Sequence, residues 1–269
     1  MRHLIKLALL TFVVAFAAGA VEAQRVDRNI RYAPSGMRLD LCRPAADKVR
    51  KTIVILIHGG GFTDGDRSDM LGLCETLSQG GFLSATISYR LARSGKGYPA
   101  PVDDVKSAIE WARANAARYG ADQGHVVVMG YSAGGTLALS AGLSTNSGVA
   151  AIIDVAGISD FGQALRETQH QRLRDDINAY LRGTPAEAAS PIRLVSRDDP
   201  PVLVFHGKAD SLVPVAQSVR LAEELNRANV KMLLRVFDGG GHDILTADSP
   251  HLEQLLREMT DFLLAVDES

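Results

Sequence analysis

The stretch that decides the fold is VVVMGYSAGGTLALSAG, residues 126–142. Four apolar residues lead into a serine, Ser132, that is flanked by glycines, and small and apolar residues follow it. The β-branched run predicts a buried strand, and the segment after Ser132 predicts a helix. The pattern G-x-S-x-G between a strand and a helix is typical of a nucleophile elbow, where glycines let the backbone crowd around an exposed Oγ. The alternative is a serine that only caps the helix.

Strand-like and helix-like segments alternate on both sides of this stretch. The patterns predict strands over residues 52–58, 82–89, 125–130, 149–157, 200–207 and 231–237, and helices over 102–120, 136–143, 218–230 and 251–266. The alternation predicts an α/β fold, with a mostly parallel central sheet covered by helices on both faces. The pattern NIRYAPSGMRLDLCRP, residues 29–44, predicts a hairpin at the sheet edge. In such sheets, sites form at the carboxyl ends of the strands.

A second glycine motif, HGGGF, follows the first long strand at residues 58–62. Consecutive glycines are entropically costly to order, but they can bring bare N–H groups close to a substrate oxygen. We therefore expect an oxyanion hole made by the amides of Gly60 or Gly61 together with Ala133, which follows the serine. The alternative is a flexible surface loop.

These two motifs, with ISYRL, YPAPVDDV, PPVLVFHGKADSLVP and GGGHDI, resemble the HGGG-type carboxylesterases of the α/β-hydrolase superfamily. The resemblance is to the hormone-sensitive-lipase-like and the feruloyl or acetyl-xylan esterase-like groups, and it covers about residues 32–266. It implies the α/β-hydrolase fold with at most a small lid, which residues 158–199 could form. It also implies a triad in the order Ser, Asp, His, with no cofactor and no metal.

Matched to the motifs of that family, the triad consists of Ser132, Asp210 and His242. Asp210 follows a late strand, whereas the competing acids Asp160 and Asp238 fit loop or capping roles better. His242 follows a glycine-rich loop after the last strand and precedes the final helix, as a general base in this order should. The other histidines are assigned to the leader, to element starts, to a charged segment or to structural hydrogen bonds; they are His3, His58, His125, His170, His206 and His251.

The N-terminus has the layout of a cleavable signal peptide over residues 1–23. Arg2 and Lys6 precede a short apolar run, and small residues lead up to Ala23, where cleavage is expected, with Ala20 as the alternative site. The run is too short for a stable membrane anchor, which needs roughly 20 residues. We therefore expect a secreted or periplasmic protein whose catalytic domain spans residues 24–269.

Export permits a disulfide between the two cysteines, Cys42 and Cys74. Cys74 lies in the apolar pattern MLGLCETL, which favours a small core residue instead, and both possibilities remain open at this stage.

Three further groups of residues have ordinary structural interpretations. Asp64, Asp66 and Asp69 fit a solvated turn better than a cation site. Asp103 and Asp104 open a helix and suit its dipole. Trp111, on the same helix, is expected to be packed or half-exposed rather than a ligand platform.

The formal net charge of -2 provides no basic field for nucleic acid. We predict a carboxylesterase for short acyl chains, acting in an open cleft on small-molecule or polysaccharide-linked esters. The alternatives are a serine peptidase of the same superfamily and a non-catalytic hydrolase-like binding module. The sequence leaves the oligomeric state open.

Overall fold

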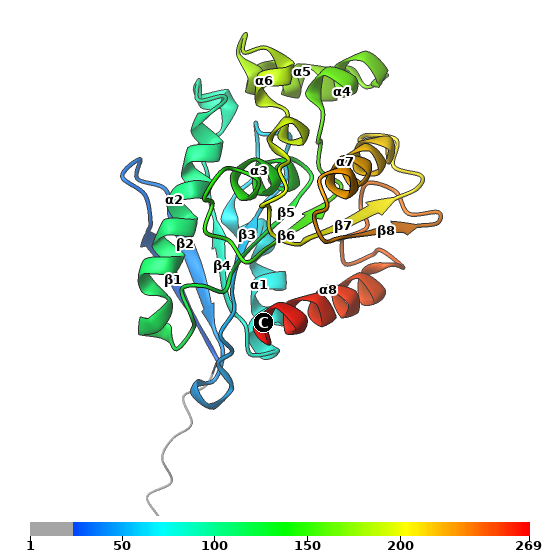
Figure 1. The fold of residues 1–269 in the computed structure, drawn as a ribbon. Coiled ribbons are helices and arrows are strands. Elements are labelled where there is room, and N and C mark those ends of the chain that lie inside the picture. Colours follow the sequence, from blue (N-terminus) through cyan, green and yellow to red (C-terminus); the bar gives the residue numbers. More distant parts are fainter. Residues whose placement is uncertain (1–23) are drawn as a thin grey trace, which may run out of the picture.

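The computed structural model describes residues 24–269, so the predicted signal peptide lies outside the described residues. The strands form one sheet in the order β1-β2-β4-β3-β5-β6-β7-β8 (Figure 1). Their bounds are β1 Arg25–Arg31, β2 Arg38–Arg43, β3 Ile53–Ile57, β4 Leu83–Ile87, β5 Val126–Tyr131, β6 Ala151–Val155, β7 Val202–Gly207 and β8 Met232–Phe237. Strands β3 to β8 pair in parallel, and the hairpin β1–β2 joins the edge antiparallel, as predicted.

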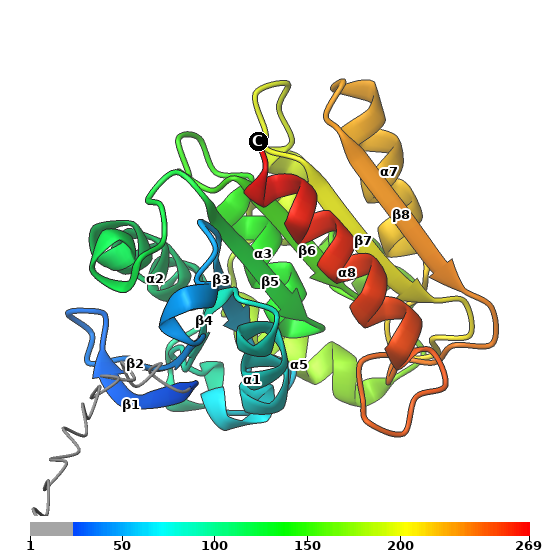
Figure 2. The same cartoon turned by 90° about the horizontal axis from the view of Figure 1, so that it is seen from below.

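The helices are α1 Leu71–Gln79, α2 Ala100–Asn115, α3 Ala133–Gly142, α4 Phe161–Glu167, α5 Gln171–Leu181, α6 Ala186–Ala189, α7 Ala216–Arg227 and α8 Leu252–Asp267. Figure 2 shows α1 and α8 on one face of the sheet and α2, α3 and α7 on the other. Side chains of a strand alternate between faces. Val126 and Val128 of β5 accordingly pack with the second group, and Val127 and Met129 pack with the first.

The segment between β6 and β7 is the one predicted as a possible lid. It forms α4, α5 and α6 and lies beyond the carboxyl ends of the strands (Figure 1). Tyr180 of α5 is fully buried and stacks on Phe62 of the glycine loop, with 4.1 Å between ring centroids. The segment is therefore held to the sheet by aromatic packing directly above the HGGGF motif.

Two local expectations need correction. The helix predicted over 102–120 ends as an α-helix at Asn115 and continues as a short 3-10 turn before Gly120, whose φ of 82° ends it. Asp103 lies in the first turn of α2, as its expected role at the helix dipole requires, but Asp104 lies beyond that turn. Asp104 is buried, and its Oδ2 accepts from Arg90 Nε at 2.8 Å. Trp111 is half-buried and packs near Tyr119, as expected.

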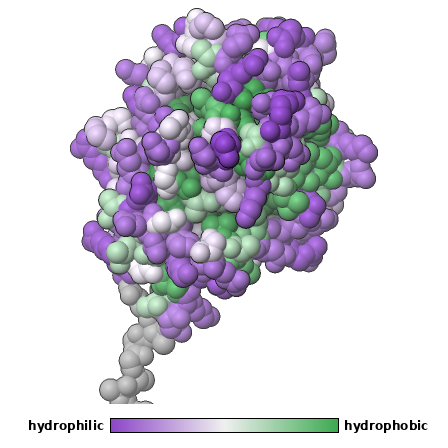
Figure 3. All heavy atoms as spheres, in the orientation of Figure 1, coloured by the Kyte–Doolittle hydropathy of each residue, from purple (hydrophilic) through white to green (hydrophobic). Residues whose placement is uncertain are grey.

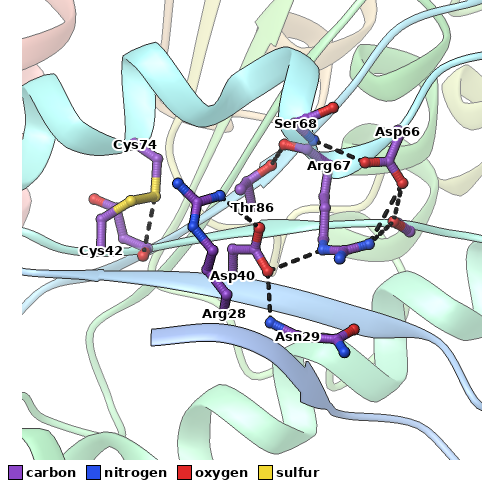
Figure 4. Close-up of polar contacts among 11 residues, drawn as sticks. Arg28, Asn29, Asp40, Cys42, Asp66, Arg67, Ser68, Cys74 and Thr86 are labelled. Carbon is purple, nitrogen blue, oxygen red and sulfur yellow. Dashed lines mark hydrogen bonds and ion pairs between the residues drawn. A yellow bond between two sulfur atoms is a disulfide. The ribbon is translucent and has the colours of Figure 1, made fainter. Parts of the chain in front are cut away.

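Cys42 and Cys74 form a disulfide that links β2 to α1 (Figure 4). Cys74 is buried as predicted, but its interpretation as a free core thiol is wrong. Next to the bond, the buried carboxylate of Asp40 accepts from Arg67 Nε at 3.0 Å and from the backbone of Asn29 at 2.7 Å. The hairpin, α1 and the 3-10 turn Arg67–Met70 before α1 are thus fixed to one another.

Among residues 24–269, none of the helices combines the length and the apolar character needed to cross a bilayer. Figure 3 shows that hydrophilic residues cover most of the face seen in Figure 1, with hydrophobic residues gathered below the α4–α6 segment.

Candidate active site

Ser132 sits at a strained turn between β5 and α3. Its φ and ψ are 55° and -120°, a region that residues with a Cβ rarely occupy. The flanking glycines are required by space: a Cβ on Gly130 would lie 2.0 Å from the carbonyl oxygen of Gly134. The amide of Ser132 donates to the Val155 carbonyl of β6 at 2.7 Å, which holds the turn against the neighbouring strand. The predicted elbow is present, and Ser132 is the non-glycine residue within it that has a positive φ.

His242 lies in the loop after β8 and reaches across to the elbow. Its Nε2 is 2.9 Å from Ser132 Oγ, and its Nδ1 is 2.7 Å from Asp210 Oδ2. A carboxylate can only accept, so Nδ1 carries the hydrogen and Nε2 of the neutral ring is free to accept from the serine hydroxyl. The three side chains predicted from distant parts of the sequence therefore form one hydrogen-bonded chain.

Asp210 is buried at the start of the loop after β7. Its Oδ1 accepts from the amides of Leu212 and Val213, at 2.9 and 2.8 Å. Its Oδ2 accepts from His242 and lies 3.3 Å from His206 Nε2. Burial by itself would raise the pKa of Asp210, but the hydrogen bonds from His206 and His242 outweigh it and hold the pKa well below its usual range. The carboxyl group is thus a permanent anion facing His242.

The competing residues are occupied elsewhere. Asp160 caps α4 by accepting from the Gln163 amide at 2.9 Å, and Asp238 is exposed beside Lys208. His58 is buried, with Nδ1 2.7 Å from the Gly59 carbonyl, and stacks on Tyr89.

The glycine loop is shaped by close backbone contacts. Gly60 has φ of 105°, and a Cβ there would lie 2.2 Å from the Asp64 carbonyl oxygen. A Cβ on Gly59 would lie 3.4 Å from Ser132 Cβ, so the loop runs directly beside the elbow. Gly61 follows with φ of 61°, and Ala133 begins α3 on the other side of the serine. The amides predicted for the oxyanion hole therefore belong to two segments that meet at Ser132.

Two site residues escaped the sequence analysis. Tyr131, inside the G-x-S-x-G motif, donates its hydroxyl to the His242 carbonyl at 2.9 Å and so ties the histidine loop to the elbow. Asp176 of α5 accepts from Thr63 Oγ1 at 3.0 Å and lies against Gly61, and burial raises its pKa. Tyr131 could have been suspected from its place in the motif, but nothing in the local sequence points to Asp176.

The acidic cluster after the glycines forms a turn, as expected. Asp66 and Asp69 make a reciprocal capping box at the start of the 3-10 turn before α1, and Asp64 accepts from the following Gly65 amide. In the part of the chain that the structure describes, no group of three or more His, Cys, Asp or Glu side chains is arranged to hold a metal ion.

Three features define an α/β-hydrolase: the mostly parallel sheet, the elbow after β5, and the loops after β7 and β8 that carry Asp210 and His242. Within that class the chain belongs to the BD-FAE family, whose model matches residues 39–225. It is similar to two proteins of Mycobacterium tuberculosis. Esterase LipC is 32% identical over 72% of this chain and 53% of the relative, and the probable carboxylic ester hydrolase LipM is 30% identical over 76% and 52%. The chain spans about half the length of these curated relatives.

Solved structures with the same fold match over nearly their whole length. A truncated carbohydrate esterase from gut microbiota has a TM-score of 0.76 and 25% identity, covering 93% of this chain and 99% of that one. A propionate-bound thermophilic esterase from the Planctomycetes species Thermogutta terrifontis has a TM-score of 0.75 and 26% identity, covering 92% and 96%.

Proposed function

We propose that this protein is a secreted serine carboxylesterase that hydrolyses short-chain carboxylic esters with Ser132, His242 and Asp210. The observation that carries the proposal is the bridging position of His242, within hydrogen-bond distance of both Ser132 Oγ and Asp210 Oδ2. Further support comes from the similarity to proteins that are named esterases.

In this mechanism, His242 Nε2 accepts the proton of Ser132 as Oγ bonds to the ester carbonyl carbon. The carbonyl oxygen becomes an oxyanion that the amides of Ala133 and of Gly60 or Gly61 bind. His242 then gives the proton to the leaving alcohol oxygen as the carbon–oxygen bond breaks. Water attacks the acyl-enzyme, again with His242 as base, and the carboxylic acid is released while Ser132 regains its proton.

The anion of Asp210 supports both steps. It fixes the tautomer of His242 and stabilises the imidazolium that forms when the ring takes the proton. One amide donor in an oxyanion hole contributes about 3–4 kcal/mol to transition-state stabilisation, so preorganised glycine amides suit this reaction. The hydrogen bond from the Ser132 amide to the Val155 carbonyl helps to compensate the backbone strain at Ser132, and the strained turn presents Oγ to His242.

The test is hydrolysis of p-nitrophenyl butyrate by the wild type and by Ser132→Ala. We expect the substitution to lower kcat by roughly 10⁴–10⁶-fold. Covalent labelling by an organophosphonate should occur only in the wild type. An unlabelled wild type would favour the non-catalytic module, and faster cleavage of a chromogenic dipeptide amide than of the butyrate ester would favour the peptidase.

The proposed substrate class is an ester with a short acyl group, including acetyl or feruloyl groups on polysaccharide. The similarity to a solved carbohydrate esterase supports the sugar-linked part of this proposal. A panel from p-nitrophenyl acetate to palmitate, with acetylated and feruloylated xylan fragments, tests it. A preference for palmitate would contradict it.

Secretion is proposed from the composition of residues 1–23 and is supported by the disulfide, because disulfides persist mainly in oxidising compartments. Sequencing the N-terminus of the mature protein from the periplasm or medium should find cleavage near Ala23. Retention of Met1 in the cytosolic fraction would contradict secretion.

A further inference from the structure

The glycine loop contains a turn with an unusual backbone. The Gly60 carbonyl accepts from the amides of Thr63 and Asp64, at 3.1 and 2.9 Å. Gly61 and Phe62 therefore form the middle of the turn, and both have a left-handed backbone, with φ of 61° and 64°. Glycine adopts such a φ freely, but a bulky residue rarely does. A strained turn of this kind persists only where the surrounding structure holds it.

The insertion between β6 and β7 gives the turn apolar support. Phe62 is buried and stacks on Tyr180 of α5, and its ring centroid lies 5.9 Å from that of Phe161 of α4. The Phe62 carbonyl also accepts from the amide of Ala92, in the segment after β4, at 2.8 Å. These contacts fix the Phe62 end of the turn.

The carboxyl group of Asp176, also on α5, supports the glycine side of the turn. Its Oδ1 accepts from Thr63 Oγ1 at 3.0 Å, and the same hydroxyl lies 3.4 Å from the Gly60 carbonyl oxygen. A Cβ added to Gly61 would collide with the Asp176 carboxyl, so this group packs directly on the glycine. Asp176 thus contacts the turn at two points, Gly61 and Thr63.

The surroundings of Asp176 leave the contact with Thr63 as its close polar contact to the loop. The Asp176 side chain is only 17% exposed, and partial burial of a carboxyl costs free energy that a hydrogen bond offsets. Arg172, one turn earlier on α5, lies 3.8 Å from Oδ2, but its side chain is 83% exposed and water screens the pair. Asp175, the next residue along, is exposed and accepts from Gln171 at 2.8 Å.

We propose that Asp176 is a positioning residue for the oxyanion hole, which fixes the glycine amides through Thr63 and through its contact with Gly61. This inference rests on the proposed function, in which Gly60 or Gly61 supplies one of the oxyanion donors. Such donors stabilise a transition state because they are in place before the reaction begins. The insertion then supports catalysis through α5, in addition to covering the site.

Five variants separate this role from a general contribution to folding. Asp176→Ala and Thr63→Val each remove the hydrogen bond, whereas Asp176→Asn and Thr63→Ser keep groups that can form it. Asp175→Ala is the matched control, because Asp175 is adjacent on the same helix but bonds to Gln171 and not to the glycine loop.

Steady-state kinetics with p-nitrophenyl butyrate gives the first readout. We expect Asp176→Ala and Thr63→Val to lower kcat about 10- to 100-fold with little change in KM, because a displaced donor still admits the substrate but stabilises the transition state less. The double variant should lose little more than either single variant, since both break the same hydrogen bond. Asp176→Asn, Thr63→Ser and Asp175→Ala should stay within a few-fold of wild type.

Inhibition by butyl trifluoromethyl ketone gives a readout that a purely structural role would not change. Ser132 Oγ bonds to the ketone carbon and its proton passes to His242, so the ketone oxygen becomes an oxyanion. The Ki of the ketone should rise in Asp176→Ala and Thr63→Val by about the factor by which kcat/KM falls. The Ki of the corresponding secondary alcohol, which forms no oxyanion, should not change.

Three results would overturn the role of Asp176: an unchanged kcat in Asp176→Ala and Thr63→Val, a loss that appears only in KM, or a lower kcat with a constant Ki for the ketone. An equal loss in Asp175→Ala would also overturn it. Circular dichroism melts check folding, and if Asp176→Ala does not fold, Thr63→Val decides. In each case the wild type still cleaves the ester, so the proposed function survives. A wild type without Ser132-dependent cleavage would instead remove the proposed function, and this inference with it.

Discussion

Two buried carboxylates, one in β6 and one in the loop after the neighbouring strand β7, differ in the direction of their pKa shifts. Asp210 follows β7 and Asp154 lies in β6, and both are shielded from solvent. The hydrogen bonds of His206 and His242 hold the pKa of Asp210 low, whereas burial raises the pKa of Asp154 from 3.8 to about 7. Burial favours the neutral form of both, so the difference comes from the number and kind of partners.

The partners can be counted in the contacts of each group. Asp154 Oδ1 accepts from the Gly157 amide at 3.0 Å, while its Oδ2 has no hydrogen-bond partner among residues 24–269. Both oxygens of Asp210 accept hydrogen bonds. The protein therefore keeps one carboxyl charged where the proposed reaction needs an anion, and makes the charge costly at the other.

His206 lies beside Asp210. Its Nε2 lies 2.8 Å from the Val213 carbonyl, which can only accept, so Nε2 carries a hydrogen. The hydroxyl of Ser218 lies 2.6 Å from Nδ1 and can donate to it. His206 thereby directs the hydrogen on Nε2 toward Asp210 Oδ2, which lies 3.3 Å away. It is a positioning residue for the triad acid.

The largest expected effect is on kcat, which should depend on Asp210 and not on Asp154. Asp210→Asn should lower kcat by on the order of 10⁴-fold, because the amide no longer stabilises the imidazolium or fixes its tautomer. Asp154→Asn is the matched control, and its kcat should stay within a few-fold of wild type. Steady-state kinetics with p-nitrophenyl butyrate makes the comparison. Equal losses in both variants would show that the roles of the two carboxylates are not distinct.

The next effect concerns stability: the buried carboxyl of Asp154 should make the free energy of unfolding depend on pH. Well below pH 4 Asp154 is protonated in both the folded and unfolded states. As the pH rises toward 7 the unfolded state ionises first, so the stability of the wild type falls and then levels off. Asp154→Asn removes this loss. Its free energy of unfolding should match wild type near pH 4 and exceed it by on the order of 2–4 kcal/mol at pH 8.

Urea unfolding at pH 4, 6 and 8 measures that difference. Parallel pH dependences for wild type and Asp154→Asn would contradict the raised pKa of Asp154. Other titrating groups contribute equally to both proteins and cancel in the comparison.

Removing His206, which lies beside Asp210, should have an intermediate effect. We expect His206→Gln to lower kcat about 10- to 100-fold with little change in KM, because Asp210 and thus His242 lose their fixed position. Ser218→Ala, which only frees the far nitrogen of the ring, should act in the same direction more weakly. Circular dichroism melts check that both variants fold. A rise in KM at constant kcat would argue against a positioning role.

The smallest effect concerns an exposed carboxylate. Asp238 pairs with Lys208 at the surface, and its side chain is 86% exposed. Because solvent screens such a pair, Asp238→Asn should leave kcat and the melting temperature unchanged within error. A clear loss of activity would reopen Asp238 as a candidate for the triad acid.

Much of the fold, and the turns at the glycine loop and at Ser132, could be predicted from local patterns. The apolar runs of β3, β5 and β7 identify buried parallel strands, and the glycines at 59–61 and around Ser132 mark turns that only small residues allow. The order of Ser132, Asp210 and His242 along the chain came from the family resemblance rather than from periodicity. The buried ion pair of Asp104 was missed because Asp104 lies in α2 and its partner, Arg90, lies in the loop after β4.

The sequence by itself determined the alternation of strands and helices and the backbone freedom at the elbow and the glycine loop, since both depend on neighbouring residues. Only the tertiary structure decided that Cys42 meets Cys74 across 32 residues, that Tyr131 binds the His242 carbonyl 111 residues away, and that His206 supports Asp210. These contacts depend on strand order and on how the loops return over the sheet. No local pattern encodes such long-range geometry, because it arises when the whole sheet is assembled.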